Sequence, residues 1–169
     1  MVFGFRRRAF ETLVRAHAPD LYRFAYWLCR DRFLAEDLVQ ETFARAWKAW
    51  DSLRREASGK AWLFSILYRE HARLYERKRL ETEALDPEEV LAGVEQDMEA
   101  GISLRAALER LPGGYREPLL LQVLGGFSCA EIGRMLRLSE ANVMQRVSRA
   151  RKALRGLLEE EATRWKERR

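Results

Sequence analysis

One predicted helix near the C-terminus carries the side chains with the clearest chemical potential. Outside its apolar positions it shows four polar residues: Asn142, Gln145, Arg146 and Arg149. Side-chain amides and guanidinium groups can bond bidentately to base edges in the major groove of duplex DNA. Ser139 stands where the helix is expected to begin, and its hydroxyl can accept a hydrogen bond from an otherwise unpaired backbone N–H. The pattern predicts a helix that reads DNA.

A helix-turn-helix over residues 127–154 would hold that helix in place. Apolar residues recur at helical spacing on either side of a tight turn, which predicts one buried face across two helices. These residues are Ile132, Met135, Leu138, Val143, Val147, Ala150 and Leu154. The motif also carries further basic residues: Arg134, Arg137, Arg151 and Lys152. Their charge suits phosphate contacts and a solvated surface equally well.

The chain offers little for other chemistry. Cys29 and Cys129 lack the spacing of metal ligands, so we expect ordinary thiols in a reducing compartment. With only His17 and His71 besides, we expect neither a zinc site nor a Cys/His nucleophile, and therefore no enzyme and no cofactor. No run approaches the roughly 18 apolar residues of a membrane span, and the N-terminus lacks the apolar stretch of a secretory signal. We expect a cytoplasmic protein without membrane insertion.

Charge divides the 169 residues into three parts. Residues 1–80 hold 17 Lys and Arg against 10 Asp and Glu, and residues 105–169 hold 14 against eight. Residues 81–104 between them hold eight acidic residues and no basic one, a composition typical of a linker. We predict two small domains joined by an acidic linker, within which a short amphipathic turn around Val90 stays possible.

Helical spacing of apolar residues runs through the first domain. The clearest helix has an apolar stripe formed by Ala35, Leu38, Val39, Phe43, Ala46, Trp47 and Trp50. A third helix is predicted from about Ala61 to Arg79, with a core face of Trp62, Leu63, Ile66 and Leu67. Pro19 predicts a break or a new first turn in the segment before them. Because no segment alternates like a strand, the predicted class is all-α.

Two polar faces of the first domain stand out. Opposite the apolar stripe lie Glu36, Asp37, Gln40 and Glu41. On the third helix, Arg69, Arg73 and Arg77 recur every four residues and so share one face, and Lys78 and Arg79 follow.

The second domain is expected to open with a leucine face formed by Leu104, Leu108 and Leu111. Pro112–Gly114 then predicts a turn, and a short helix from Tyr115 to Leu124 would end at Gly125–Gly126. Pro118 is tolerable near the first turn of that helix. We expect the basic tail, Arg164–Arg169, to fray.

These motifs resemble two conserved regions of bacterial sigma-70-type RNA polymerase sigma factors. Residues 37–43, DLVQETF, match the D-L-x-Q-E-x-F signature of region 2, and Trp62-Leu63 with Ile66 fits its W-L-x-x-I stretch. Region 4 is matched at Leu111, Pro112, Arg116, Glu131, Ile132, Val143, Arg146, Arg149, Ala150 and Arg151. A linker in place of an intervening domain resembles the extracytoplasmic-function group. The resemblance covers nearly the whole chain, and both motifs in this order are specific.

The resemblance implies roles for the polar faces. In relatives the acidic face docks on the β′ coiled coil of core polymerase, which here implies Glu36, Asp37, Gln40 and Glu41; a solvated face near a helix N-terminus is the alternative. The third helix resembles the part that recognises and opens the −10 promoter element. Its arginines and Lys78 would meet the backbone of single-stranded DNA, and Tyr68 or Tyr75 could stack on bases, while Trp62 fits the core.

Region 4 implies recognition of the −35 element in duplex DNA. The residues concerned are Arg134, Arg137, Ser139, Asn142, Gln145, Arg146 and Arg149. The family further implies the β flap of polymerase and an anti-sigma factor as partners.

The chain departs from the family pattern in both regions. Many relatives have asparagine and aspartate where Arg69 and Arg73 stand, and added charge favours phosphate affinity over base discrimination. The common G-T-V-K-S-R is replaced by ANVMQR at residues 141–146. Arg137 occupies the position of the usual turn glycine and must accept the backbone angles of the turn. We expect an unusual −35 sequence, and weaker base discrimination through the third helix.

A length estimate agrees with two DNA-bound domains. Promoter elements two helical turns apart are separated by about 70 Å, at about 34–36 Å per turn. The linker, residues 81–104, reaches roughly 80 Å when fully extended. Two alternatives remain: a polymerase-independent helix-turn-helix regulator, and a degenerate sigma-like protein that acts only by protein–protein interaction. Run-off transcription with core polymerase would separate all three.

Overall fold

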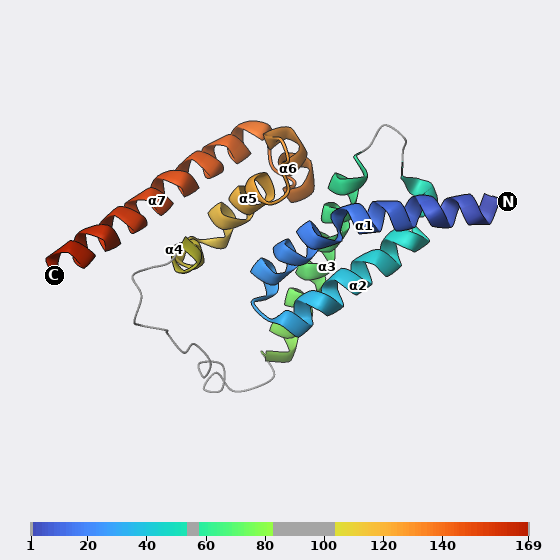
Figure 1. Ribbon diagram of the computed structural model, residues 1–169, viewed down its shortest axis with the longest axis horizontal. Helices are drawn as coiled ribbons and strands as arrows, with labels where there is room; N and C mark the ends of the chain where they lie inside the picture. The colour runs from blue at the N-terminus through green and yellow to red at the C-terminus, as the bar shows by residue number, and fades with distance from the viewer. Residues whose placement is uncertain (1, 54–57, 83–103, 169) are drawn as a thin grey trace. The chain divides into compact units, whose positions relative to one another are not determined.

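The computed structural model describes residues 2–53, 58–82 and 104–168, with the side chains of 2–3 and 78–82 left aside. Every regular element in these ranges is a helix, which confirms the predicted all-α class. The chain divides into two compact units, Met1–Asp86 and Pro87–Arg169 (Figure 1). The predicted linker falls almost wholly on residues 83–103, so the turn around Val90 lies outside the described residues.

Three long helices build the N-terminal unit: α1 (Val2–Cys29), α2 (Arg32–Lys48) and α3 (Gly59–Thr82), with a short 3-10 helix, η1 (Trp50–Ser52), after α2. Their buried faces meet in one core, which contains Leu21, Phe24, Ala35, Leu38, Ala46, Leu63, Phe64 and Leu67. A chain of edge-to-face aromatic contacts runs from Phe10 through Trp50 to Trp62 at centroid distances of 5.3 and 6.2 Å. The predicted apolar stripe and core face are therefore confirmed, although Trp62 is only half-buried.

The expected break at Pro19 is wrong, because α1 continues through that residue. Proline deprives one carbonyl of its helical donor, but Leu21 and Phe24 just beyond it are completely buried. Packing of this kind routinely outweighs a local propensity.

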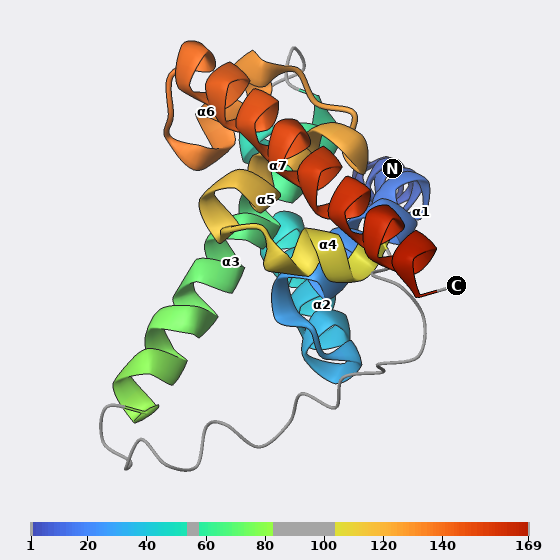
Figure 2. The same cartoon turned by 90° about the vertical axis from the view of Figure 1, so that its left-hand side faces the viewer.

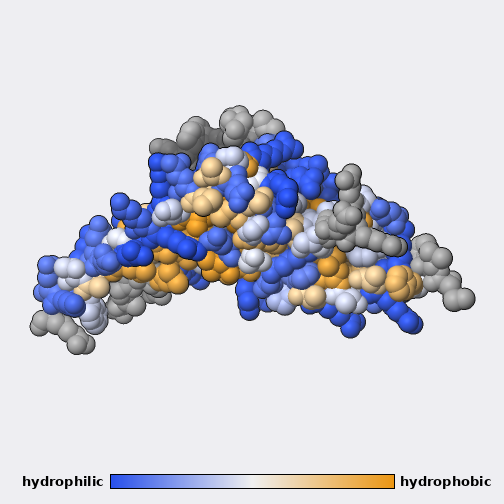
Figure 3. Space-filling view, turned by 90° about the horizontal axis from the view of Figure 1, so that it is seen from above, coloured by the Kyte–Doolittle hydropathy of each residue, from blue (hydrophilic) through white to orange (hydrophobic). Residues whose placement is uncertain are grey.

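The described residues of the C-terminal unit form four helices: α4 (Leu104–Arg110), α5 (Gly113–Val123), α6 (Cys129–Leu136) and α7 (Glu140–Glu167). Its core contains Ala107, Leu108, Leu111, Leu119, Leu121, Ile132, Val143, Val147 and Ala150. In the view of Figure 3, hydrophilic residues cover much of the surface, with hydrophobic residues grouped between them.

Three expectations for this unit need correction. Gly113 and Gly114 form the first turn of α5 rather than a loop, with Pro112 as the N-cap residue. Leu104 is 56% exposed, and Ala107 takes its place in the core. The expected fraying is wrong for residues 164–167, which lie within α7; Arg169 lies outside the described residues.

The helix-turn-helix itself is confirmed in α6 and α7. Ser128 and Glu131 form a reciprocal capping box at the start of α6, and the Ser139 hydroxyl caps α7 by accepting from the Asn142 N–H at 3.1 Å. Arg137 ends α6 in the left-handed conformation, with φ of 56° and ψ of 45°. Gly133 is required beside it, since a Cβ there would lie 2.6 Å from the Leu138 carbonyl oxygen.

Candidate nucleic-acid and protein interfaces

The acidic face of α2 is open to solvent. Asp37, Gln40 and Glu41 are exposed, whereas Glu36 is half-buried. No acidic residue lies in the first turn of α2, where the helix dipole acts most strongly. The dipole therefore gives little reason for this concentration of negative charge.

Both ends of this face are paired within α2. Glu36 accepts a hydrogen bond from Nε of Arg32 at 3.1 Å, which raises the pKa of the Arg32 guanidinium. Glu41 accepts from Nε of Arg45 at 2.8 Å. The structure shows no contact of the same kind for Asp37 within the described residues, so its carboxylate is open to a basic partner.

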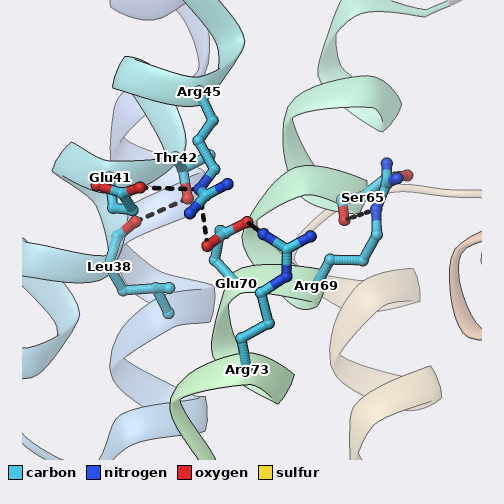
Figure 4. A network of polar contacts seen from close by, with 8 residues as sticks. All are labelled: Leu38, Glu41, Thr42, Arg45, Ser65, Arg69, Glu70 and Arg73. Atoms are coloured by element: carbon cyan, nitrogen blue, oxygen red, sulfur yellow. Dashed lines mark hydrogen bonds and ion pairs between the residues drawn. The ribbon is translucent and has the colours of Figure 1, made fainter.

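A buried carboxylate lies behind the acidic face. Glu70 of α3 is 7% exposed, and its side chain receives Arg45 at 2.9 Å and Arg73 at 3.1 Å (Figure 4). Beneath Arg45, the buried hydroxyl of Thr42 donates to the Leu38 carbonyl at 2.7 Å. Arg45 thus joins α2 to α3 through an ion pair with Glu70, while its single Nε hydrogen is donated to Glu41.

The arginines predicted to contact DNA on α3 differ in their partners. Arg69 is exposed and donates from Nε to the Ser65 carbonyl at 3.0 Å, which leaves its charge unopposed. Arg73 is exposed but is paired with Glu70, so part of its charge is already neutralised. Arg77 is exposed, and no described carboxylate lies within ion-pair distance of it.

The C-terminal half of α3 diverges from α2 in Figure 2 and is largely open to solvent. Tyr75 is 66% exposed there, whereas Tyr68 is half-buried. The side chains of Lys78 and Arg79 lie outside the described residues, as do residues 54–57 of the preceding loop.

The polar residues at the start of α7 share one side of the helix but differ in exposure. Gln145 and Arg149 are exposed, together with Arg134, Arg137 and Ser139 around the turn. Asn142 and Arg146 are half-buried. Met144 is also exposed, at 57%, although its apolar type gave no sign of a surface role in the sequence.

Arg146 holds α7 against α5. Its Nε donates to Oδ1 of Asn142 at 2.7 Å, and its Nη1 donates to the Gly114 carbonyl at 3.2 Å. Pro118 lies four residues after Gly114 and has no N–H to offer that carbonyl, so Arg146 supplies the missing donor. A Cβ on Gly114 would lie 3.0 Å from Nη1 of Arg146, so a larger residue there would require this guanidinium to shift slightly.

A second contact joins the same helices. Arg151, which the sequence left between phosphate contact and solvated charge, donates to Oε1 of Gln122 at 2.6 Å. The Gln122 amide in turn approaches the Cys129 sulfur at 3.8 Å. Sequence reasoning missed Gln122 because nothing in its local spacing marks a partner 29 residues away.

Other site chemistry is limited in the part of the chain that the structure covers. The described residues include no group of three or more His, Cys, Asp or Glu side chains placed to hold a metal ion. None of the described helices has the length and hydropathy that a membrane crossing requires. Burial lowers the pKa of His17, and the nearby positive charge of Lys60 adds to this effect.

Comparison with known proteins shows the family to which this chain belongs. Residues 13–81 match Sigma-70 region 2, and residues 102–154 match Sigma-70 region 4. The chain is 34% identical over 149 residues to the ECF RNA polymerase sigma factor EcfG of Rhodopseudomonas palustris, covering 86% of this chain and 82% of EcfG. This chain belongs to the extracytoplasmic-function (ECF) group of RNA polymerase sigma factors.

Further relatives agree with this ECF assignment. The ECF sigma factor SigE of Mycolicibacterium smegmatis is 33% identical over 159 residues, which are 89% of this chain but 62% of SigE. Among solved structures, the sigma factor RpoE in complex with the anti-sigma factor NepR from Bartonella quintana aligns with a TM-score of 0.73 at 30% identity, covering 90% of this chain and 98% of that one. CnrH in complex with the cytosolic domain of CnrY aligns with a TM-score of 0.69, covering 92% and 90%.

The region matches place the two polar networks in this ECF sigma factor. The Glu70 network lies within the region 2 match, and Arg146 with its partners lies within the region 4 match. The α7 helix continues about three and a half turns past the end of the region 4 match at residue 154.

Proposed function

We propose that this ECF sigma factor binds core RNA polymerase and directs it to promoters, without catalysing a reaction of its own. The observation that carries the proposal is the order of two matched regions, each with an exposed polar face of the required sign: acidic on α2, basic on α3 and α7. Sigma factors regulate transcription, and such a role requires the protein in the cytoplasm with polymerase and promoter DNA.

The acidic face of α2 is the proposed docking site for the β′ coiled coil. Asp37, Gln40 and Glu41 are exposed, and a basic partner could pair with the two carboxylates without unfolding the helix. Glu36 is half-buried and paired with Arg32, so we assign it a smaller share of the contact.

On α3, the proposed contact with −10 DNA is led by Arg69, Arg77 and Tyr75. Their side chains are exposed, and an arginine row beside an aromatic ring suits the backbone and unstacked bases of a single strand. Arg73, Tyr68, Lys78 and Arg79 stay in the proposed set, with Arg73 limited by its pairing with Glu70.

On the helix-turn-helix, we propose that Gln145 and Arg149 read −35 bases. Both are exposed near the start of α7, the part of a recognition helix that reaches base edges. Asn142 and Arg146 are engaged with each other, so we assign them to positioning; Arg134, Arg137 and Ser139 flank the turn and suit phosphate contacts.

We also propose the β flap and an anti-sigma factor as protein partners. Two solved structures similar to this chain are complexes of sigma factors with NepR and with the cytosolic domain of CnrY. The proposal extends that kind of partner to this protein on the strength of 30% identity in each case.

Charge reversal on α2 tests the docking face. The double variant Asp37→Arg, Glu41→Arg should lose co-purification with core polymerase and run-off transcription, because like charges would then face the basic coiled coil. Circular dichroism should show unchanged helicity, since both side chains are exposed.

Glu160→Arg with Glu167→Arg, two exposed positions on α7, is the charge-matched control and should retain polymerase binding. Retained binding by the α2 double variant would refute the docking assignment. A wild-type protein that footprints duplex DNA without polymerase would favour an independent helix-turn-helix regulator instead.

A further inference from the structure

Glu70 is a buried acidic residue among the arginines of α3, and the proposed function does not use it. It is 7% exposed, and a buried carboxylate is stable only when cations or hydrogen-bond donors surround it. Arg45 and Arg73 provide these cations, one from each of two helices: Arg73 donates a hydrogen bond to Glu70 at 3.1 Å, and Arg45 forms an ion pair with it at 2.9 Å. Their own side chains are 44% and 59% exposed, so each guanidinium lies between the buried carboxylate and solvent.

Arg45 is shared between two carboxylates. Its Nε lies 2.8 Å from Glu41 on the acidic face of α2 and 2.9 Å from Glu70. A continuous row of alternating charge therefore leads from Glu41 through Arg45 and Glu70 to Arg73 (Figure 4). The row starts on the proposed polymerase-docking face and ends in the proposed −10 face.

We propose that Glu70 is a positioning residue that withholds Arg73 from DNA in the free protein, and that a basic partner group at Glu41 weakens this hold. This inference rests on the proposed function and deepens it. In the free protein Arg45 pairs with both Glu41 and Glu70. Because Arg45 neutralises Glu70 only in part, Glu70 also pairs with Arg73. A basic group that pairs with Glu41 would leave Arg45 wholly to Glu70, and Arg73 could then turn to a phosphate.

The coupling works in both directions. A phosphate that takes Arg73 leaves Arg45 as the remaining cation for Glu70, which draws Arg45 away from Glu41 and opens Glu41 to a basic partner. Thermodynamic linkage requires that polymerase binding and DNA binding strengthen each other by the same factor. The two ligands need no shared contact for this effect.

Removing the Glu70 charge tests the hold on Arg73 directly. Binding of the full-length free protein to a fluorescent oligothymidine is followed by anisotropy over a salt series. Glu70→Gln should bind roughly threefold to tenfold more tightly at low salt, with a salt slope steeper by about 0.7, the value for one added phosphate contact on a single strand. Measured against Arg73→Gln alone, Glu70→Gln with Arg73→Gln should show no gain.

Glu76→Gln is the matched control, because it removes the same charge from an exposed position on the same helix. The inference is overturned if Glu70→Gln and Glu76→Gln bind alike, or if the gain survives Arg73→Gln. Circular dichroism establishes that each variant is folded.

A second variant keeps the buried carboxylate and covers the case in which Glu70→Gln does not fold. Glu41→Gln should also tighten oligothymidine binding, by a smaller factor, because it releases Arg45 to Glu70. Asp37→Asn, exposed on the same face, is its control and should bind like wild type. Equal binding by Glu41→Gln and Asp37→Asn would contradict the proposal.

Measurements on holoenzyme distinguish a failure of this inference from a failure of the proposed function. Once core polymerase is bound, the advantage of Glu70→Gln over wild type on oligothymidine should shrink toward unity; an advantage that persists undiminished would overturn the coupling. If wild type forms no holoenzyme at all, the proposed function fails, whereas the measurements on the free protein still decide whether Glu70 holds Arg73.

Discussion

The two units hold arginines beside their proposed DNA-contacting faces in different ways. In the N-terminal unit a buried carboxylate, Glu70, receives Arg45 and Arg73. In the C-terminal unit Arg146 donates to a backbone carbonyl, that of Gly114, and to the Asn142 amide oxygen. The first arrangement neutralises positive charge; the second fixes the guanidinium and leaves its charge intact.

Whether an arginine is held by a carboxylate or by neutral acceptors affects how it can bind DNA. An arginine paired with a carboxylate must break that ion pair before it binds a phosphate. Its contribution to DNA binding therefore depends on whether another cation can pair with the carboxylate. An arginine held by neutral acceptors still attracts DNA while it stabilises the fold. If the proposed coupling holds, the N-terminal unit responds to a partner, whereas Arg146 in the C-terminal unit keeps its charge in either state.

The largest expected effect concerns Arg146. Arg146→Gln should destabilise the C-terminal unit by about 2 kcal/mol, because the Gly114 carbonyl would lose its charged donor and Pro118 cannot replace it. Urea unfolding followed by circular dichroism would measure this loss. Arg149→Gln, exposed on the same helix, should weaken DNA binding without changing stability. Equal stability of the two variants would show that the carbonyl contact does not support the fold.

A smaller effect is expected at the two arginines that end helices with φ of 56°, Arg30 after α1 and Arg137 after α6. Left-handed backbone costs a non-glycine residue about 1 kcal/mol, so Arg137→Gly should raise the thermal midpoint of its unit. Arg30→Gly should gain less, since it also loses the stacking of Arg30 on Trp27 at 5.8 Å. A fall in the midpoint for Arg137→Gly would show that its side chain contributes more than the strain costs.

The smallest effect is a pH dependence that belongs to the N-terminal unit, because both histidines lie there. Burial lowers the pKa of His17 below its ordinary value in the folded state, so the unfolded chain binds the proton first as pH falls. The contribution of His17 to stability is complete above about pH 6.5 and declines as pH falls through that value. Thermal unfolding at pH values between about 5.5 and 7.5 should show a shallower decline for His17→Gln than for wild type. If the midpoints of wild type and His17→Gln decline in parallel, His17 does not contribute to the pH dependence of stability.

Local patterns predicted most of the fold and the family. The stripe from Ala35 to Trp50 and the apolar spacing around Ser139 depend on contacts three or four residues apart, which one sequence displays directly. Errors arose where tertiary packing outweighed a local signal, as at Pro19, where buried neighbours keep α1 continuous. The first turn of α5 is a similar case, because Gly114 is fixed there by a contact with α7.

The candidate site was predicted in part. The acidic face of α2 and the exposure of Gln145 and Arg149 follow from helical periodicity. The pairing of Glu70 with Arg73 has the i,i+3 spacing of a helical ion pair and could have been foreseen. Nothing local indicated that Arg45 would reach the same carboxylate.

The sequence by itself determined the helices, the order of the two regions and the sign of charge on each face, because these depend on residue types and short spacings. Only the tertiary structure decided which arginines remain available to DNA. Arg45 meets Glu70 and Arg146 meets Gly114, partners 25 and 32 residues away, since the packing of one helix on another fixes the donors and acceptors at their interface. An arginine side chain is long enough to reach several acceptors, and the residues packed around it determine which acceptor it binds.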